Sequence, residues 1–227
     1  MKGFFLTGTD TGCGKTFVSC EILRHLSSKG LDVVGLKPIA SGAKKISDEL
    51  RNEDVTMLWK NSNINIKETD ICRYIFPEAC SPHIASLINN ENIELDSISN
   101  FVDNFTDISD IIVVEGIGGW HVPINSTERV SELAEVLDLP VLLVVSNKLG
   151  CLNHASLTYE AILRTKVKFS GWILNKLENN IVASRSVESS LEKILGCAPI
   201  LTVEFKNNSF SSAQFERFSE LIMDSVN

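Results

Sequence analysis

The sequence predicts an α/β fold in which helices cover both faces of a doubly wound, mostly parallel sheet. Short apolar segments alternate with longer amphipathic segments, the pattern of strands that alternate with helices. The segment 111–115 is apolar on both faces, as expected of a central parallel strand. A glycine-rich turn joins the first apolar segment to the first amphipathic one. These observations together predict repeated strand–helix–strand units.

The first strands and helix are predicted from simple local signals. Residues 3–7 are mostly apolar and predict a strand. Residues 15–28 predict a helix because apolar side chains recur at i, i+4 spacing, and Lys29-Gly30 provides a C-terminal stop. Residues 33–37 predict the second strand, which Pro38 closes.

The rest of the chain continues the alternation. Residues 48–60 and 83–106 are predicted to be mostly helical, the second range with a break near 89–92. Residues 111–115 predict a central strand. After it, the expected strands are 141–146, 170–175 and 200–203, and the expected helices are 153–166, 182–195 and 213–225.

Length and composition indicate one globular unit. The chain has 227 residues, of which 44% are hydrophobic and 22% charged, so it can bury a substantial core. It shows no internal repeat, low-complexity linker or shift in composition. We therefore expect residues 1–227 to form a single domain.

Charge and cysteine usage narrow the partners and the compartment. The net charge of -8 argues against binding to nucleic acid or to an anionic membrane, and no run of Lys and Arg compensates for it. No apolar stretch predicts a signal peptide or a membrane span. The cysteines are scattered without a C-x-x-C pair, as in reduced proteins, and stand at positions 13, 20, 72, 80, 151 and 197. We expect a cytoplasmic protein.

The predicted fold also indicates where a ligand binds. In open parallel sheets, binding sites gather at the carboxyl ends of the strands. The segments that follow the predicted strands are 8–16, 37–42, 115–120 and 147–153, together with Asn175.

The segment Gly8–Thr16, with the sequence GTDTGCGKT, predicts a phosphate-binding loop. Its glycines let backbone N–H groups curl around phosphate oxygens at a helix N-terminus. Lys15 supplies a positive charge for the phosphates, and the Thr16 hydroxyl can bind Mg²⁺. Five residues separate Gly8 from Gly14, one more than in the usual motif. This longer spacing is typical of a variant class of P-loop nucleoside triphosphatases. The alternative is a glycine-rich turn with a solvent-exposed lysine.

Two further strand ends carry charged residues. Glu115 ends a buried strand beside the phosphate loop, where a carboxylate can hold Mg²⁺ directly or through water. Its alternative role is that of a strand-end acid with a structural partner. Lys37 could point its ammonium into the same crevice, although an exposed strand-end lysine is more common. Asp54 lies in a polar stretch typical of a solvated helix face, and the pattern alone does not select it.

These segments resemble the dethiobiotin synthetase family. The resemblance covers residues 1 to about 176 in separate blocks that occur in the same order. The blocks are Thr7–Thr11 with Gly14–Thr16, Lys37–Gly42, Arg51–Asp54, Ser81–His83, Val114–Gly116 with Gly118–Trp120, Lys148–His154, and Gly171–Asn175.

The resemblance implies a ligase of biotin biosynthesis with ATP as co-substrate and Mg²⁺ as cofactor. Its substrates would be 7,8-diaminononanoate (diaminopelargonic acid) and CO₂ or bicarbonate. One amine takes up CO₂ to form a carbamate, ATP phosphorylates the carbamate, and the second amine closes the ureido ring. The products would be dethiobiotin, ADP and phosphate.

The resemblance also implies roles for individual residues. Lys15 and Lys37 would neutralise charge on the γ-phosphate and carbamate, and Thr11 and Ser41 would hydrogen-bond the carbamate or the transferring phosphate. The Mg²⁺ ligands would be Thr16, Asp54 and Glu115. Nucleotide contacts would come from Gly12, Cys13, Gly14, Lys15, Thr16, Glu115, Gly116, Gly118 and Asn175, the last reading the adenine edge. The substrate would contact Ser41 and, across a homodimer interface, the helix start formed by Gly150, Cys151, Leu152 and Asn153.

The sequence departs from the family pattern near its end. Beyond residue 180 the resemblance fades, and Leu201–Phe205 replaces the usual Gly-x-x-Pro turn, so nucleotide contacts there are not carried over. The main alternative is a partition or septum-positioning ATPase, which would carry an extra lysine where Thr9–Gly12 has none. An amidating ligase would need a glutaminase domain, for which 227 residues leave no room. A nucleotide-binding module without turnover conflicts with the intact Lys15 and Thr16.

Overall fold

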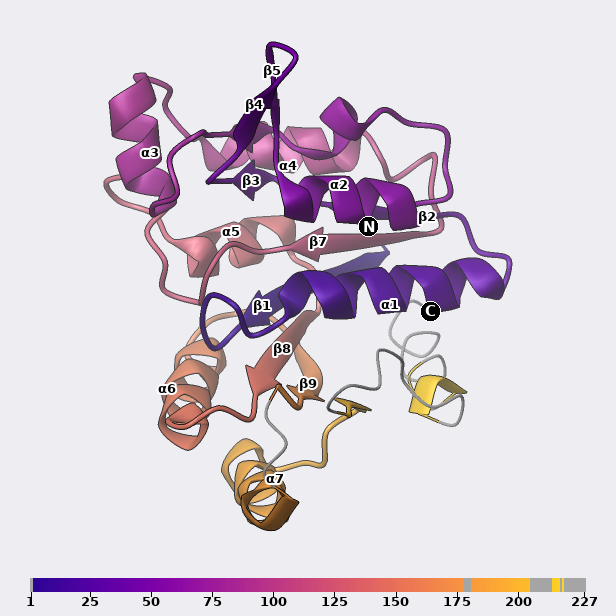
Figure 1. The fold of residues 1–227 in the computed structure, drawn as a ribbon, viewed down its shortest axis with the longest axis vertical. Coiled ribbons are helices and arrows are strands. Elements are labelled where there is room, and N and C mark those ends of the chain that lie inside the picture. Colours follow the sequence, from indigo (N-terminus) through magenta and orange to yellow (C-terminus); the bar gives the residue numbers. More distant parts are fainter. Residues whose placement is uncertain (1, 178–180, 205–213, 217, 219–227) are drawn as a thin grey trace.

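The computed structural model describes residues 2–177, 181–204, 214–216 and 218. Within these residues, one sheet contains six strands in the order β10-β9-β8-β1-β7-β2, and every neighbouring pair is parallel (Figure 1). The strands are β1 (Gly3–Gly8), β2 (Val33–Leu36), β7 (Ile111–Glu115), β8 (Val141–Ser146), β9 (Phe169–Asn175) and β10 (Leu201–Val203). The predicted α/β fold with a mostly parallel sheet is confirmed.

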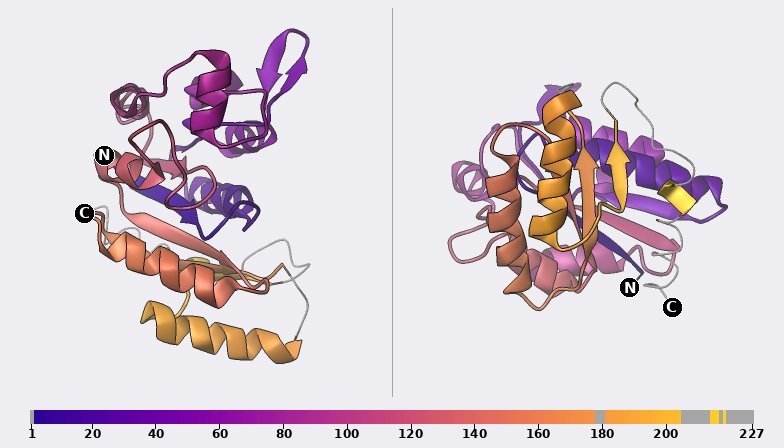
Figure 2. Two further views of the ribbon diagram at one scale, coloured as in Figure 1. Left: turned by 90° about the vertical axis from the view of Figure 1, so that its left-hand side faces the viewer. Right: turned by 90° about the horizontal axis from the view of Figure 1, so that it is seen from below.

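Helices cover the sheet (Figure 2), and six of them pack on one another in pairs. Helix α1 packs on α2, α4 on α5, and α6 on α7. Their bounds are α1 (Lys15–Ser28), α2 (Glu53–Asn61), α3 (Pro82–Asn89), α4 (Leu95–Asp103), α5 (Val130–Leu137), α6 (Cys151–Leu163) and α7 (Ile181–Leu195). Among the described residues, no helix is long and apolar enough to cross a membrane.

Close packing of α1 and α2 on β2 depends on one glycine. A Cβ atom at Gly35 would lie 2.6 Å from Leu23 Cδ1 of α1 and 3.0 Å from Leu58 Cδ2 of α2. The missing side chain therefore lets both helices approach the strand. This contact fixes the start of α2 close to the carboxyl end of the sheet.

The register of β2 and β7 brings the charged residues at their carboxyl ends together. Leu36 pairs with Val114, so the next residues, Lys37 after β2 and Glu115 at the end of β7, lie side by side at the carboxyl ends of the two strands. Likewise, Leu6 pairs with Glu115, which places the loop after β1 at the same edge. All three segments therefore meet at the carboxyl ends of parallel strands, where ligands bind in such folds.

The predicted helix over 48–60 is wrong in its first turn. Residues Lys44–Ile46 (β4) and Glu49–Arg51 (β5) form an antiparallel hairpin that projects from the molecule (Figure 1). Ser47 and Asp48 have φ angles of 50° and 69°, which suit a tight hairpin turn. Helix α2 begins only at Glu53, after this hairpin.

Smaller differences concern other elements. The break predicted near 89–92 is confirmed, because α3 ends at Asn89 and Asn90 adopts a left-handed conformation. Helix α5 was not predicted, and α6 begins at Cys151 rather than at residue 153. The short strands β3 (Ile39–Ala40) and β6 (Tyr74–Ile75) and the 3-10 turn Glu68–Ile71 were also not predicted. The helix expected over 213–225 lies largely outside the described residues.

Candidate active site

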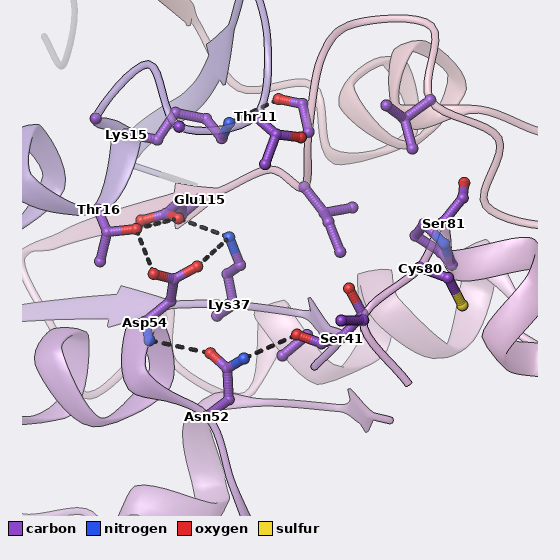
Figure 3. Close-up of a pocket in the computed structure, with 18 residues that line it drawn as sticks. Thr11, Lys15, Thr16, Lys37, Ser41, Asn52, Asp54, Cys80, Ser81 and Glu115 are labelled. Atoms are coloured by element: carbon purple, nitrogen blue, oxygen red, sulfur yellow. Dashed lines mark hydrogen bonds and ion pairs between the residues drawn. The ribbon is translucent and has the colours of Figure 1, made fainter. Parts of the chain in front are cut away.

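A cavity of about 660 Å³ lies at the carboxyl ends of β1, β2 and β7 (Figure 3). Its walls come from the phosphate loop, the segment after β2, the start of α2, the start of α3 and the loop after β7. Ten of the predicted site residues line it: Thr11, Gly12, Gly14, Lys15, Thr16, Lys37, Ser41, Asp54, Glu115 and Gly118. The fold thus brings together residues that lie more than 100 positions apart in the sequence.

Two backbone carbonyl groups hold the side chain of Lys15, one from the phosphate loop and one from the loop after β7. Lys15 Nζ donates hydrogen bonds to the carbonyl oxygens of Asp10, at 3.2 Å, and Gly118, at 2.7 Å. Burial lowers the pKa of Lys15, and the positive charge of Lys37 acts in the same direction. Gly14 has a φ of 93° and caps α1, and a Cβ there would lie 2.0 Å from Asn175 Nδ2. Glycine is therefore required at position 14 both by conformation and by space.

Three oxygen-bearing side chains converge beside the loop. Thr16 Oγ1 lies 2.8 Å from both Asp54 Oδ1 and Glu115 Oε1 (Figure 3). A threonine hydroxyl has one hydrogen, so it can satisfy only one of these two carboxylate oxygens by donation. A hydroxyl and two carboxylates are the hard oxygen ligands that Mg²⁺ prefers. The donor set therefore fits the predicted magnesium site.

Lys37 balances the charge of the two carboxylates. Its ammonium donates to Glu115 Oε1 at 2.6 Å and to the Gly116 carbonyl at 3.0 Å, and lies 3.4 Å from Asp54 Oδ2. Its side chain is 4% exposed and that of Glu115 is fully buried. Burial by itself lowers the pKa of Lys37, but the charges of Glu115 and Asp54 outweigh it, so that the pKa is raised. Lys37 is thus not the exposed strand-end lysine of the alternative interpretation.

Asn52 positions two walls of the cavity, and no role was predicted for it. Its Oδ1 accepts hydrogen bonds from the backbone N–H groups of Asp54 and Val55, which caps α2. Its Nδ2 donates to the carbonyl of Ser41 at 3.0 Å. A cap residue before a helix is a recognisable sequence signal, but the predicted helix began too early for Asn52 to occupy the cap position.

Ser19 is a second residue that the sequence did not single out. Its buried hydroxyl lies 2.9 Å from the Lys15 carbonyl and 3.2 Å from Glu115 Oε2. Ser19 stands one helical turn after Lys15, so the same face of α1 that begins at the phosphate loop also contacts Glu115. Only the packing of α1 against β7 reveals this contact.

The other predicted site residues lie outside the cavity wall. Gly116 contributes its carbonyl to Lys37, and the carbonyl of the buried Cys13 accepts a hydrogen bond from Asn175 Nδ2 at 2.9 Å. Asn175 therefore contacts the phosphate loop directly. The segment from Gly150 to Asn153 forms the start of α6, where Gly150 has a φ of 92°, and none of its residues lines the cavity.

Two relatives with similar sequences are ATP-dependent dethiobiotin synthetases. The chain is 39% identical to the ATP-dependent dethiobiotin synthetase of Wigglesworthia glossinidia brevipalpis, with 96% of each chain covered. It is 37% identical to the ATP-dependent dethiobiotin synthetase of Cellvibrio japonicus, with 89% of this chain and 91% of the relative covered. A family model described as an AAA domain matches residues 2–206.

Solved structures with a similar fold are more distant. The hydrogenase maturation factor HypB of Archaeoglobus fulgidus has a TM-score of 0.60 at 13% identity, covering 100% of this chain and 91% of that one. A ParA family ATPase of Chlorobium tepidum has a TM-score of 0.56 at 16% identity, covering 99% and 92%. These two structures show the P-loop fold alone. The identities to relatives along nearly the whole chain place it, by contrast, in one family: the chain belongs to the ATP-dependent dethiobiotin synthetases.

Proposed function

We propose that this protein uses ATP and Mg²⁺ to convert 7,8-diaminononanoate and CO₂ to dethiobiotin, ADP and phosphate in biotin biosynthesis. The observation that carries the proposal is the meeting of two lysines with a hydroxyl and two carboxylates in one cavity of a dethiobiotin synthetase family member. Lys15 and Lys37 provide positive charge, and Thr16, Asp54 and Glu115 provide oxygen ligands. These are the parts that phosphoryl transfer requires.

The reaction proceeds in three bond-forming steps. One amine nitrogen attacks CO₂ and loses a proton, which gives a carbamate. A carbamate oxygen then attacks the γ-phosphorus of ATP, and ADP leaves. Finally the second amine attacks the carbamoyl carbon, phosphate leaves, and the ring closes with loss of a proton. No side chain is needed as a base in the last step, because the departing phosphate can accept the proton.

The chain's own residues act mainly through charge and position. Lys15 and Lys37 stabilise negative charge on the carbamate and on the transferred phosphoryl group, which is the largest catalytic contribution in such sites. Thr11 and Ser41 provide hydroxyl groups at the cavity wall, and Asn52 holds the Ser41 backbone in place. Mg²⁺, held by Thr16, Asp54 and Glu115, would neutralise charge on the phosphates.

Two segments outside the cavity wall are assigned to the nucleotide base and to the substrate carboxylate. Asn175, beside the phosphate loop, is assigned to the adenine edge. The start of α6 from Gly150 to Asn153 is assigned to the carboxylate, because backbone N–H groups at a helix N-terminus favour anions. Since this segment does not line the cavity of its own chain, we assign it to the cavity of a second copy in a homodimer.

Two broader assignments accompany this function. We propose that residues 1–227 form a single domain and that the protein acts in the cytoplasm. All six cysteines lie at described positions and none is joined in a disulfide, which supports a reducing compartment.

The test is phosphate release from ATP and Mg²⁺ in the presence of the diamine and bicarbonate, with each component omitted in turn. We expect release to require both the diamine and bicarbonate. Mass spectrometry should find a product that has gained one CO and lost two hydrogens relative to the diamine. Slow ATP turnover that is independent of the diamine would refute the substrate assignment and favour a nucleotide switch.

A further inference from the structure

The phosphate loop contains an acid that its function does not explain. Asp10 lies between Gly8 and Gly14, in the segment that curls around phosphates. A carboxylate near a bound triphosphate raises the energy of the bound state through charge repulsion, which is still appreciable at the effective dielectric constant of a partly solvated site. The side chain of Asp10 is 45% exposed, so burial does not remove its charge.

The contacts of Asp10 show what offsets this charge. Its Oδ2 accepts a hydrogen bond from Lys148 Nζ at 2.8 Å, and its Oδ1 accepts one from the Thr11 backbone N–H at 2.7 Å. Its backbone carbonyl accepts a hydrogen bond from Lys15. Asp10 thus contacts three residues, two of which, Thr11 and Lys15, line the cavity.

Both members of the ion pair carry their charge at neutral pH. The hydrogen bond from Lys148 holds the pKa of Asp10 below its ordinary value, and the same bond raises the pKa of Lys148. Lys148 lies in the loop between β8 and α6, and stands two residues before Gly150. The pair therefore connects the phosphate loop to the loop that begins α6.

We propose that Lys148 is a positioning residue that neutralises Asp10, whose other oxygen accepts the Thr11 N–H in the phosphate loop, so that this carboxylate does not oppose binding of the phosphates. The inference rests on the proposed function, since it assumes that the loop binds ATP. Lys148 does not line the cavity, and it is not one of the proposed Mg²⁺ ligands. It therefore acts through Asp10. It thereby couples the geometry of the nucleotide site to the start of α6.

This arrangement makes the effects of substitution asymmetric. Lys148→Met leaves the Asp10 carboxylate without its counter-ion beside the nucleotide phosphates. Asp10→Asn removes the charge but keeps a carbonyl oxygen that can accept the Thr11 N–H. Adding Asp10→Asn to Lys148→Met should therefore restore most of the affinity that Lys148→Met loses. If the ion pair were merely structural, Lys148→Met, Asp10→Asn and the double variant would all weaken binding equally. No rescue would then be seen.

The experiment measures binding of a fluorescent ATP analogue with Mg²⁺, without diamine, to the full-length protein. Lys148→Met should bind about fivefold more weakly, the size expected of one partly solvated unit charge. Lys148→Arg should bind within about twofold of the original protein, because it preserves the charge, and so should the double variant. The matched control is Lys45→Met, which removes an ion pair of 2.9 Å with Asp48 on the projecting hairpin and should leave binding unchanged.

The outcomes separate this inference from the proposed function. Thermal denaturation of each variant checks that it folds, and a variant that does not fold is replaced by Lys148→Gln. Affinity that is unchanged in Lys148→Met, or a double variant as weak as Lys148→Met, would overturn the positioning role. If the original protein binds the analogue but does not consume the diamine, the proposed substrate fails while the rescue pattern still decides the role of Lys148.

Discussion

Lys15 and Lys37 lie in the same cavity, but their charges are held in different ways. Both side chains are largely buried, yet Lys15 donates to two backbone carbonyls while Lys37 contacts two carboxylates. Burial lowers the pKa of Lys15, whereas the carboxylates outweigh burial and raise the pKa of Lys37. The two lysines therefore differ in what they contribute to the fold, even though both are assigned to catalysis.

This difference predicts that the two lysines affect stability to very different extents. Lys37→Met leaves the buried Glu115 without its counter-ion and should lower the free energy of unfolding by about 3–5 kcal/mol. Lys15→Met removes a charge that burial disfavours and should change it by less than about 1 kcal/mol. Both variants should lose turnover. Urea denaturation of the two proteins at neutral pH measures the difference.

The pH dependence provides a control for the same prediction. The pKa of Lys37 in the folded protein is raised above its ordinary value of 10.5. The charge of Lys37 therefore contributes its full stabilisation to the folded state below pH 10.5, and this stabilisation is lost as the pH rises through the folded-state pKa. The stability gap between the original protein and Lys37→Met should therefore narrow only at alkaline pH. Equal destabilisation by both substitutions would contradict this account of the charges.

Among the elements, the start of α2 connects folding most directly to the site. Asn52 caps the helix with its Oδ1 and holds the Ser41 carbonyl with its Nδ2. Asn52→Ala should cost about 1 kcal/mol of stability, the usual effect of losing a helix cap, and should raise the KM for the diamine. Asn52→Ser retains a cap acceptor but loses the bond to Ser41. It should therefore keep most of the stability while the KM still rises, which denaturation and steady-state kinetics can separate.

The same elements show what could be predicted from the sequence. Strands β1, β7 and β8 are buried along their whole length, so uninterrupted apolar runs predicted them nearly to the residue. The hairpin of β4 and β5 was missed because its residues are mostly exposed and charged, which gives no alternation of apolar side chains. Its stability comes from the turn and from backbone pairing rather than from a buried face.

Residues of the site could be predicted from the sequence only where a local motif marks them. Lys15 and Thr16 follow from a local motif, because phosphate binding needs consecutive backbone N–H groups at a helix start. Asp54 depends on the Asn52 cap, which was missed because the predicted helix began too early, and on the packing of α2 against β2, which leaves no local pattern. Only the family resemblance identified Asp54. The contact of Ser19 with Glu115 required the three-dimensional structure.

At the scale of the whole molecule, exposed apolar side chains gather near the start of α6. Leu149 is 99% exposed, and Leu157 of α6 is 60% exposed. A second hollow of about 400 Å³ adjoins the main cavity, shares Thr11 and Val122 with it, and includes Leu157 in its wall. Burial of such side chains by a second copy would remove apolar surface from water.

This surface predicts a dimer whose loss impairs use of the substrate more than binding of ATP. Light scattering after size-exclusion chromatography should give a mass near twice 25.1 kDa. Leu157→Glu places a charge in the proposed interface, so it should shift the mass toward one chain and raise the KM for the diamine. The control is Ile108→Glu. Ile108 is 51% exposed, but it precedes β7 and so lies at the amino ends of the strands, away from the cavity. A monomeric original protein with full activity would contradict both the dimer and the assignment of the α6 start to the partner's substrate.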